Sequence, residues 1–96
     1  MDRTTAERRK IYALKILYEA NPQDKYFRVY TVRRAMEELL DRTLRDDDVK
    51  ETLNQLHSRG LVERAPESDV WIYRLTPRGR EFWKSHEAAL VLISSG

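Results

Sequence analysis

The chain has 96 residues, of which 41% are hydrophobic and 35% charged, and it contains no cysteine. This length fits a single ordinary domain with one core, so we expect one domain over residues 1–96. The absence of cysteine excludes disulfides, thiolate metal sites and a cysteine nucleophile. Basic residues exceed acidic ones by 18 to 16, a net charge of +2 that is compatible with an anionic partner.

Neither a membrane span nor a secretory signal is expected. The longest apolar run extends only from Ala88 to Ile93, far short of the roughly 20 residues that cross a membrane. The first residues, Met1 to Glu7, are polar and lack the apolar stretch of a signal peptide. We therefore expect a cytoplasmic protein that does not contact membranes.

The first predicted element is a helix over residues 4–20. Thr4 and Glu7 have the spacing of a capping box, in which two side chains satisfy free amide groups at a helix start. Apolar residues then recur at steps of three and four, as on one buried face of a helix. After this helix, the aromatic and β-branched segment from Tyr26 to Tyr30 predicts a short strand.

Two helices are predicted next, over residues 32–42 and 47–59. Thr31 offers a hydroxyl cap for the first of them. Any of the three aspartates in Asp46–Asp48 can cap the second, which is expected to end where Gly60 takes the left-handed conformation. The connection between them is about four residues long, which is typical of a helix-turn-helix.

A change of hydrophobic period predicts a β-hairpin over residues 61–75. The β-prone segments are Leu61–Arg64 and Val70–Leu75, and the polar residues 65–69 between them are expected to form a loop. Trp71, Tyr73 and Leu75 alternate with their neighbours and are expected to share one face of the second strand.

A last helix is predicted over residues 77–93, with Thr76 as its cap and Pro77 in its first turn. The predicted fold is therefore mainly α with a small β-hairpin, an α+β protein in the order α-β-α-α-β-β-α. The apolar face of the last helix is wider than a small domain needs for its own core, so we expect a homodimer formed through it. The residues expected in this interface are Phe82, Trp83, His86, Ala89, Leu90 and Ile93.

Two segments resemble winged helix-turn-helix proteins. Residues 49–64 look like the recognition helix and first wing strand, and residues 73–81 are similar to the second wing strand and following helix of PadR-like and MarR-like transcriptional regulators. The resemblance covers roughly residues 10–85. It implies a small, repressor-like transcriptional regulator that binds specific double-stranded DNA, with residues 47–59 in the major groove and the hairpin on the backbone or minor groove.

The resemblance also implies two sets of contacts. On the outward side of residues 47–59, Asn54 or Gln55 can pair bidentately with adenine, and Lys50 can meet guanine. The expected base contacts are Asp47, Lys50, Glu51, Asn54, Gln55 and Ser58. The expected contacts to the DNA backbone are Arg33, Arg34, Arg45, Arg64, Arg74 and Arg78.

Charge leaves a second interpretation open. Residues 45–60 carry three basic and four acidic side chains, a net charge of −1, whereas DNA affinity comes largely from neutralised phosphates. The alternative is a winged-helix protein-interaction module that does not bind DNA. Its aromatic residues Trp71, Tyr73, Phe82 and Trp83 fit a core or an interface better than a base-stacking platform.

No catalytic or metal-binding pattern is present in the sequence. His57 and His86 do not have the spacing of zinc ligands. Ser85, His86 and Glu87 cannot form a triad, because consecutive residues on a helix point about 100° apart. With three glycines in the chain there is no glycine-rich phosphate loop. We therefore expect no enzyme, no metal and no cofactor.

Overall fold

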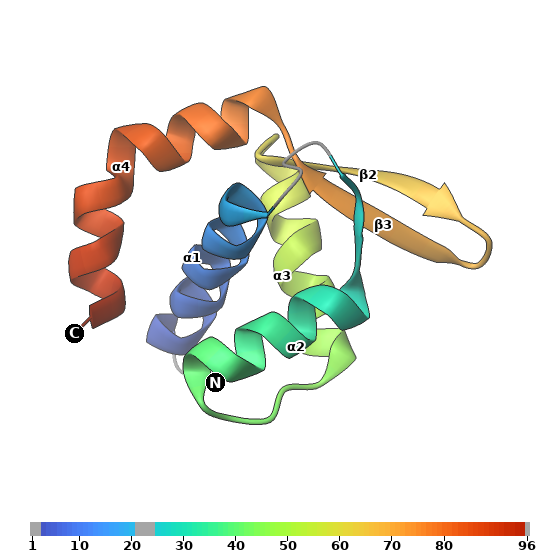
Figure 1. Cartoon of the computed structure of the whole chain (residues 1–96), viewed down its shortest axis with the longest axis horizontal. Helices are drawn as coiled ribbons and strands as arrows, with labels where there is room; N and C mark the ends of the chain where they lie inside the picture. Colours follow the sequence, from blue (N-terminus) through green and yellow to red (C-terminus); the bar gives the residue numbers. More distant parts are fainter. Residues whose placement is uncertain (1–2, 21–24, 96) are drawn as a thin grey trace.

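The computed structural model describes the backbone of residues 3–20 and 25–95 and the side chains of residues 6–20 and 25–86. Over this part of the chain it is mainly helical with one small antiparallel sheet, which agrees with the expected α+β class and order of elements (Figure 1). The elements are α1 (Arg3–Glu19), β1 (Phe27–Arg28), α2 (Val29–Leu40), α3 (Asp46–Ser58), β2 (Val62–Glu67), β3 (Val70–Leu75) and α4 (Pro77–Ser95).

The predicted bounds of α2 were wrong at both ends. The helix begins at Val29 directly after β1, so Thr31 lies in its first turn and cannot cap it. The capping position belongs to Arg28, whose backbone is extended and whose side chain makes no capping hydrogen bond. The helix ends at Leu40, because Asp41 takes the left-handed conformation with φ 53°.

The ends of α3 were predicted more closely. The helix begins at Asp46 after Arg45, and no side chain caps it, so the predicted aspartate cap was wrong. The three aspartates lie in the first turn, where their charges favour the positive end of the helix dipole. Gly60 has φ 76° beyond the other end, as predicted.

The hairpin is longer than the sequence predicted. Ala65 pairs with Ile72 and Glu67 pairs with Val70, so β2 continues through most of the segment expected to be a loop. Only Ser68 and Asp69 form the turn. The hairpin therefore projects well beyond the helices, as Figure 1 shows.

Strand β3 lies in the middle of the sheet, between β1 and β2. The pairing of β1 is brief, since only Phe27 opposite Tyr73 and Arg28 opposite Ile72 are in register. The chain then turns into α2. Within the described residues, the first part of β3 consequently has no strand beside it on the β1 side.

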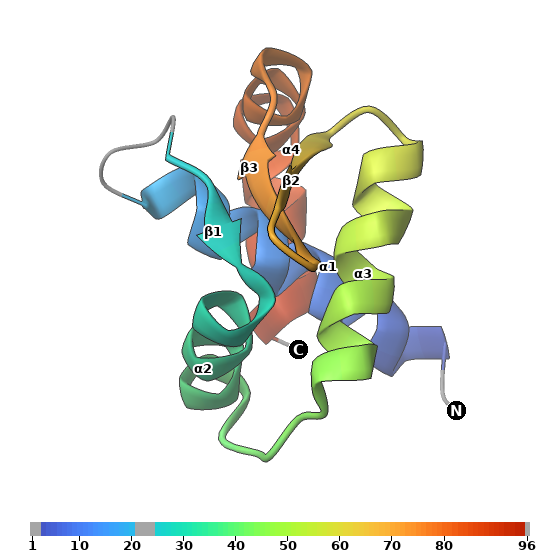
Figure 2. The same cartoon turned by 90° about the vertical axis from the view of Figure 1, so that its right-hand side faces the viewer.

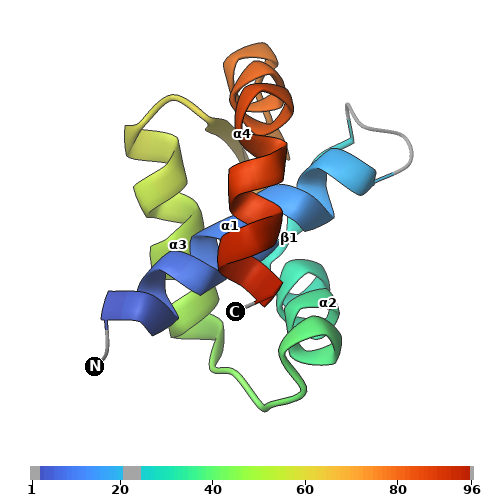
Figure 3. The ribbon, with the colours of Figure 1, turned by 90° about the vertical axis from the view of Figure 1, so that its left-hand side faces the viewer.

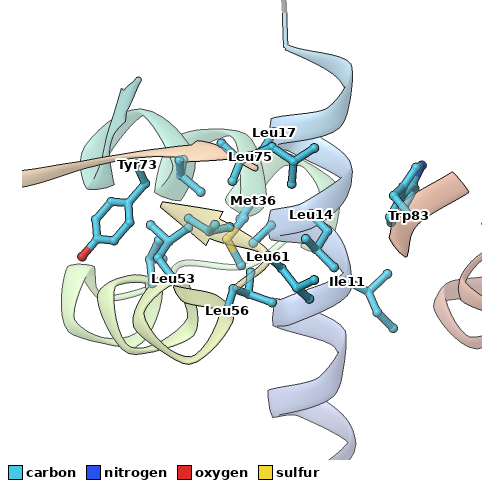
Figure 4. Packing of buried hydrophobic residues seen from close by; sticks show 14 of the residues in the cluster. Ile11, Leu14, Leu17, Met36, Leu53, Leu56, Leu61, Tyr73, Leu75 and Trp83 are labelled. Carbon is cyan, nitrogen blue, oxygen red and sulfur yellow. The ribbon is translucent and has the colours of Figure 1, made fainter. Parts of the chain in front are cut away.

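Helix α1 lies in the centre of the molecule, with α2 and α3 on one side and α4 crossing it on the other (Figures 2 and 3). Leu14 and Leu17 of α1 point into the same cluster as Leu61 and Leu75 (Figure 4). The Thr76 hydroxyl oxygen accepts a hydrogen bond from the Gly79 amide at 2.9 Å, so Thr76 caps α4 as predicted. Among the described residues, no helix has the combined length and apolar character that crossing a membrane requires.

The turn between α2 and α3 is organised by Glu37. Its Oε2 atom accepts a hydrogen bond from the Leu44 amide at 2.8 Å and from Arg33 Nη1 at 3.1 Å. Arg33 Nε also lies 2.6 Å from Oδ1 of Asp46, at the start of α3. The Leu44 amide and, to a smaller extent, the neighbouring arginines hold the pKa of Glu37 below its ordinary value, against the opposing effect of burial.

This lowered pKa predicts a dependence of stability on pH. The stabilisation is complete above the ordinary Glu37 pKa of 4.5 and is lost as the pH falls through the lower folded-state value. Between about pH 6 and about pH 3, we expect the Tm of Glu37→Gln to fall less than that of the unmodified protein. Thermal unfolding followed by circular dichroism measures this. Glu38→Gln, at an exposed site on the same helix, is the control, and parallel curves for Glu37→Gln and the unmodified protein would contradict the assignment.

Candidate nucleic-acid interface

The outward side of α3 forms a shallow hollow of about 400 Å³. Val49, Leu53 and Leu56 of the same helix are fully buried, so the predicted division of α3 into an inward and an outward side is confirmed. The hollow is lined by all six predicted base contacts, Asp47, Lys50, Glu51, Asn54, Gln55 and Ser58. The structure therefore gathers these residues on one surface of α3, and the projecting hairpin lies beside this helix (Figure 2).

The hairpin is attached to this surface through Asn54. Arg64 and Tyr73 are cross-strand partners, and because side chains alternate along a strand, they share the face of the hairpin that meets α3. The Oδ1 atom of Asn54 accepts a hydrogen bond from Arg64 Nη1 at 3.1 Å and one from the Tyr73 hydroxyl at 2.8 Å. Burial raises the pKa of Tyr73, which keeps its hydroxyl protonated as a donor.

These two bonds change what Asn54 can offer to a base. Bidentate recognition of adenine uses the amide oxygen as an acceptor and the amide nitrogen as a donor. Here the oxygen already serves Arg64 and Tyr73, so only the amide nitrogen remains available. The expected adenine pairing through Asn54 is not compatible with this arrangement, whereas donation to a base acceptor is.

Two other residues on the outward side of α3 differ in whether a neighbouring side chain binds them. Gln55 Nε2 donates to Oε1 of Glu51 at 3.3 Å, one helical turn away. Lys50 is exposed, and none of the described residues forms an ion pair with it. Lys50 is therefore the unneutralised cation in the middle of α3.

Two of the predicted backbone contacts have structural partners instead. Arg33 is 20% exposed and lies between Glu37 and Asp46 at the turn between the helices. Arg74 forms an ion pair with Glu63, and its guanidinium lies 4.5 Å from the ring centre of Tyr26. Since Arg74 alternates with Tyr73, it lies on the face of the hairpin that points away from α3.

The other four predicted backbone contacts have no carboxylate partner among the described residues. Arg45 is exposed immediately before the helix, and the exposed Arg78 lies beside Gly60 after its end. Arg64 contacts Asn54 directly. Arg34 is exposed on α2, with its guanidinium 6.0 Å from the ring centre of Tyr30. Positive charge therefore lies at both ends of α3 and on the hairpin.

The residues predicted for a dimer interface differ from one another in burial. Trp83 is 4% exposed within the single chain and packs 6.0 Å from the Tyr18 ring, so it is a core residue (Figure 4). Phe82 is half-buried and stacks on the exposed His86 with ring centres 4.4 Å apart. The side chains of Ala89, Leu90 and Ile93 lie outside the described residues.

A second hollow, which the sequence did not predict, lies between the start of α2, α3 and the end of the hairpin. It has a volume of about 310 Å³, and Tyr30, Lys50 and Trp71 are among its lining residues. Tyr30 and Trp71 are each more than 40% exposed, at 56% and 42%. In the sequence, Tyr30 and Trp71 are aromatic residues near the starts of α2 and β3. Nothing in the sequence indicated that the two residues share a site.

Comparison of the chain with protein-family models, with curated proteins and with solved structures gave no significant match. Within the described residues, no group of three or more histidine, aspartate or glutamate side chains is arranged to hold a metal ion. The interpretation of the site therefore rests on its own geometry.

The contact between hairpin and helix can be tested with Tyr73→Phe. This change removes one donor from Asn54 and keeps the buried ring, so we expect a loss of about 0.5–1.5 kcal/mol in the free energy of unfolding. Urea denaturation measures the loss. Tyr30→Phe removes a hydroxyl from an exposed ring and should change the free energy by less than about 0.5 kcal/mol. Equal effects of the two variants would show that the Tyr73 hydroxyl bond does not stabilise the fold.

Proposed function

We propose that the protein is a winged-helix transcriptional regulator that binds specific sequences of double-stranded DNA. The observation that carries this proposal is the hollow on the outward side of α3 lined by six polar and charged side chains, with the hairpin held beside it through Asn54. An α-helix fits the major groove of DNA, where polar side chains can distinguish all four base pairs. In this arrangement α3 lies in the major groove, and the hairpin lies along the adjacent backbone.

The distribution of charge supports the same orientation. Acidic side chains outnumber basic ones within α3, but Arg45 and Arg78 lie at its two ends and Arg64 lies on the hairpin. Contacts to phosphates position a protein on DNA, and contacts to base edges supply the sequence preference. We therefore assign the phosphate contacts to these three arginines and to Arg34, and the base contacts to the residues of the hollow.

The alternative function is a protein-interaction module with the same fold. Exposed apolar side chains on the hairpin favour it, because Val70 and Trp71 are 52% and 42% exposed. Aromatic residues are enriched in protein interfaces. Unlike DNA binding, a contact of this kind would not require neutralised phosphates.

A salt titration distinguishes the two functions. We expect the protein to bind a random-sequence duplex with an affinity that falls steeply as the salt concentration rises, because counterions are released from the phosphates. Fluorescence anisotropy of a labelled duplex measures the slope of log K against log salt. Arg45→Ala and Arg78→Ala should each reduce this slope by about one unit. Lys15→Ala is the control with the same loss of charge on α1, where Lys15 pairs with Glu19, and its slope should not change.

Lys50→Ala tests the base contacts in the same assay. We expect it to reduce the preference for a selected duplex over the random pool by about 1–3 kcal/mol, since Lys50 is assigned to a base edge. Arg45→Ala should weaken binding to both duplexes equally. If the unmodified protein fails to bind any duplex at low salt, the proposal of DNA binding is wrong.

We further propose that two copies of the chain associate through α4. Phe82 lines an open hollow of about 740 Å³ between the end of α3 and α4, and the sequence beyond it is apolar from Ala88 to Ile93. A dimer would present two copies of α3 and double the number of phosphate contacts.

Sedimentation equilibrium at micromolar concentration should give about twice the chain mass of 11.5 kDa. Leu90→Glu should return the protein to a monomer, because a charge in an apolar contact is costly. Lys84→Glu, at an exposed position of α4, is the matched control and should remain dimeric. A monomeric unmodified protein would contradict association through α4.

A further inference from the structure

The hollow beside the hairpin exists because β1 is short. β1 pairs with β3 only as far as Arg28 opposite Ile72, and the chain then becomes α2. The remaining edge of β3, at Val70 and Trp71, faces the start of α2 across a space of about 310 Å³. This volume is at the lower end of the roughly 300–1,000 Å³ found for small-molecule sites, so the hollow suits one small, flat group.

An arginine guanidinium group lies over each of two aromatic rings at this hollow. The Arg64 guanidinium lies 4.4 Å from the ring centre of Trp71, and that of Arg33 lies 5.1 Å from the ring centre of Tyr30. Both rings nevertheless stay 42% and 56% exposed. An exposed ring supported by a cation is a suitable platform for a nucleobase, since stacking one base on an aromatic side chain contributes about 1–3 kcal/mol.

The polar groups of the hollow also fit a nucleotide. Lys50 lines this hollow as well as the hollow on α3, so the two adjoin at this residue, and its ammonium group can meet a phosphate. Asp69 lies at the rim, where its carboxylate can accept a hydrogen bond from the amino group of a base. The carboxylate of Asp46, which also lines the hollow, is already paired with Arg33.

We propose that this hollow binds a nucleobase, stacked on Trp71 and Tyr30, from an unpaired nucleotide next to a duplex that lies along α3. The placement of a duplex along α3 rests on the proposed function. The stacking of a base in the hollow does not depend on it. A free nucleotide has the same ring and phosphate, so the experiment must distinguish the two sources.

Trp71 can report directly on the stacked base. Because Trp71 and the buried Trp83 are the only two tryptophans, Trp83→Phe makes Trp71 the single fluorophore. The test compares the fluorescence of Trp71 with three kinds of probe: a blunt duplex, the same duplex with a four-nucleotide 3′ or 5′ overhang, and deoxycytidine or deoxyadenosine monophosphate. The expected result is quenching of Trp71 by an overhang duplex and not by the blunt duplex, because only the former offers an unpaired base.

Affinity provides a second measurement in case Trp83→Phe does not fold. With Trp83 in place, anisotropy should show an overhang duplex bound about tenfold more tightly than the blunt duplex, as expected for one stacked base. Trp71→Ala should remove this difference without weakening blunt-duplex binding. Trp71→Phe should retain most of the difference, because the stacking surface is conserved.

The outcomes separate the two proposals. Equal affinity for all duplexes together with an unchanged Trp71 signal would overturn the nucleobase site, whatever happens to duplex binding. Quenching of Trp71 fluorescence by the overhang duplex, without any binding of the blunt duplex, would support the nucleobase site and contradict the proposed function. Quenching by the free monophosphates at the same affinity as by the overhang would support the site with a free nucleotide as its ligand.

Discussion

The side-chain amide oxygen of Asn54 accepts hydrogen bonds from two residues of the hairpin, and this contact determines how α3 and the hairpin are presented together. Tyr73 is fully buried in the central strand of the sheet, with its hydroxyl pointing toward α3 (Figure 4). The core therefore positions one donor, and Arg64 positions the other from the neighbouring strand. On the other side of the hairpin, the ion pair between Arg28 and Glu67 holds it beside β1.

The proposed interface depends on which charges are left unpaired. Arg33 and Arg74 have carboxylate partners, so their charges stabilise the turn between the helices and the outer face of the hairpin. Among the described residues, the cations without a carboxylate partner include Arg45 and Arg78 near the ends of α3, Lys50 in its middle and Arg64 on the hairpin. A protein with a net charge of only +2 can still bind DNA if its unpaired cations are placed on one side.

Helix ends and strand lengths depend on contacts that a local pattern does not contain. α2 starts at Val29 because β1 ends there, and the hydrophobic period at Val32 gave no indication of the extra turn. β2 includes the polar segment through Glu67, because each of its residues pairs with one in β3 and Arg28 forms an ion pair with Glu67. Composition predicted a loop there because polar residues and Pro66 are common in loops, and pairing across the hairpin overrides that tendency.

The order of elements, the class of fold and the buried side of α3 could be predicted from the amino-acid sequence, because the spacing of apolar residues specifies which face of a helix or strand leaves water. The sequence also identified the outward residues of α3, since these follow from the same period. Packing of the elements against one another, by contrast, brings Asn54 to the hairpin, gives Arg33 and Arg74 their carboxylate partners, and places Tyr30 and Trp71 around one hollow. Each of these is a contact between residues distant in the chain or on different elements, and no local periodicity encodes such a contact.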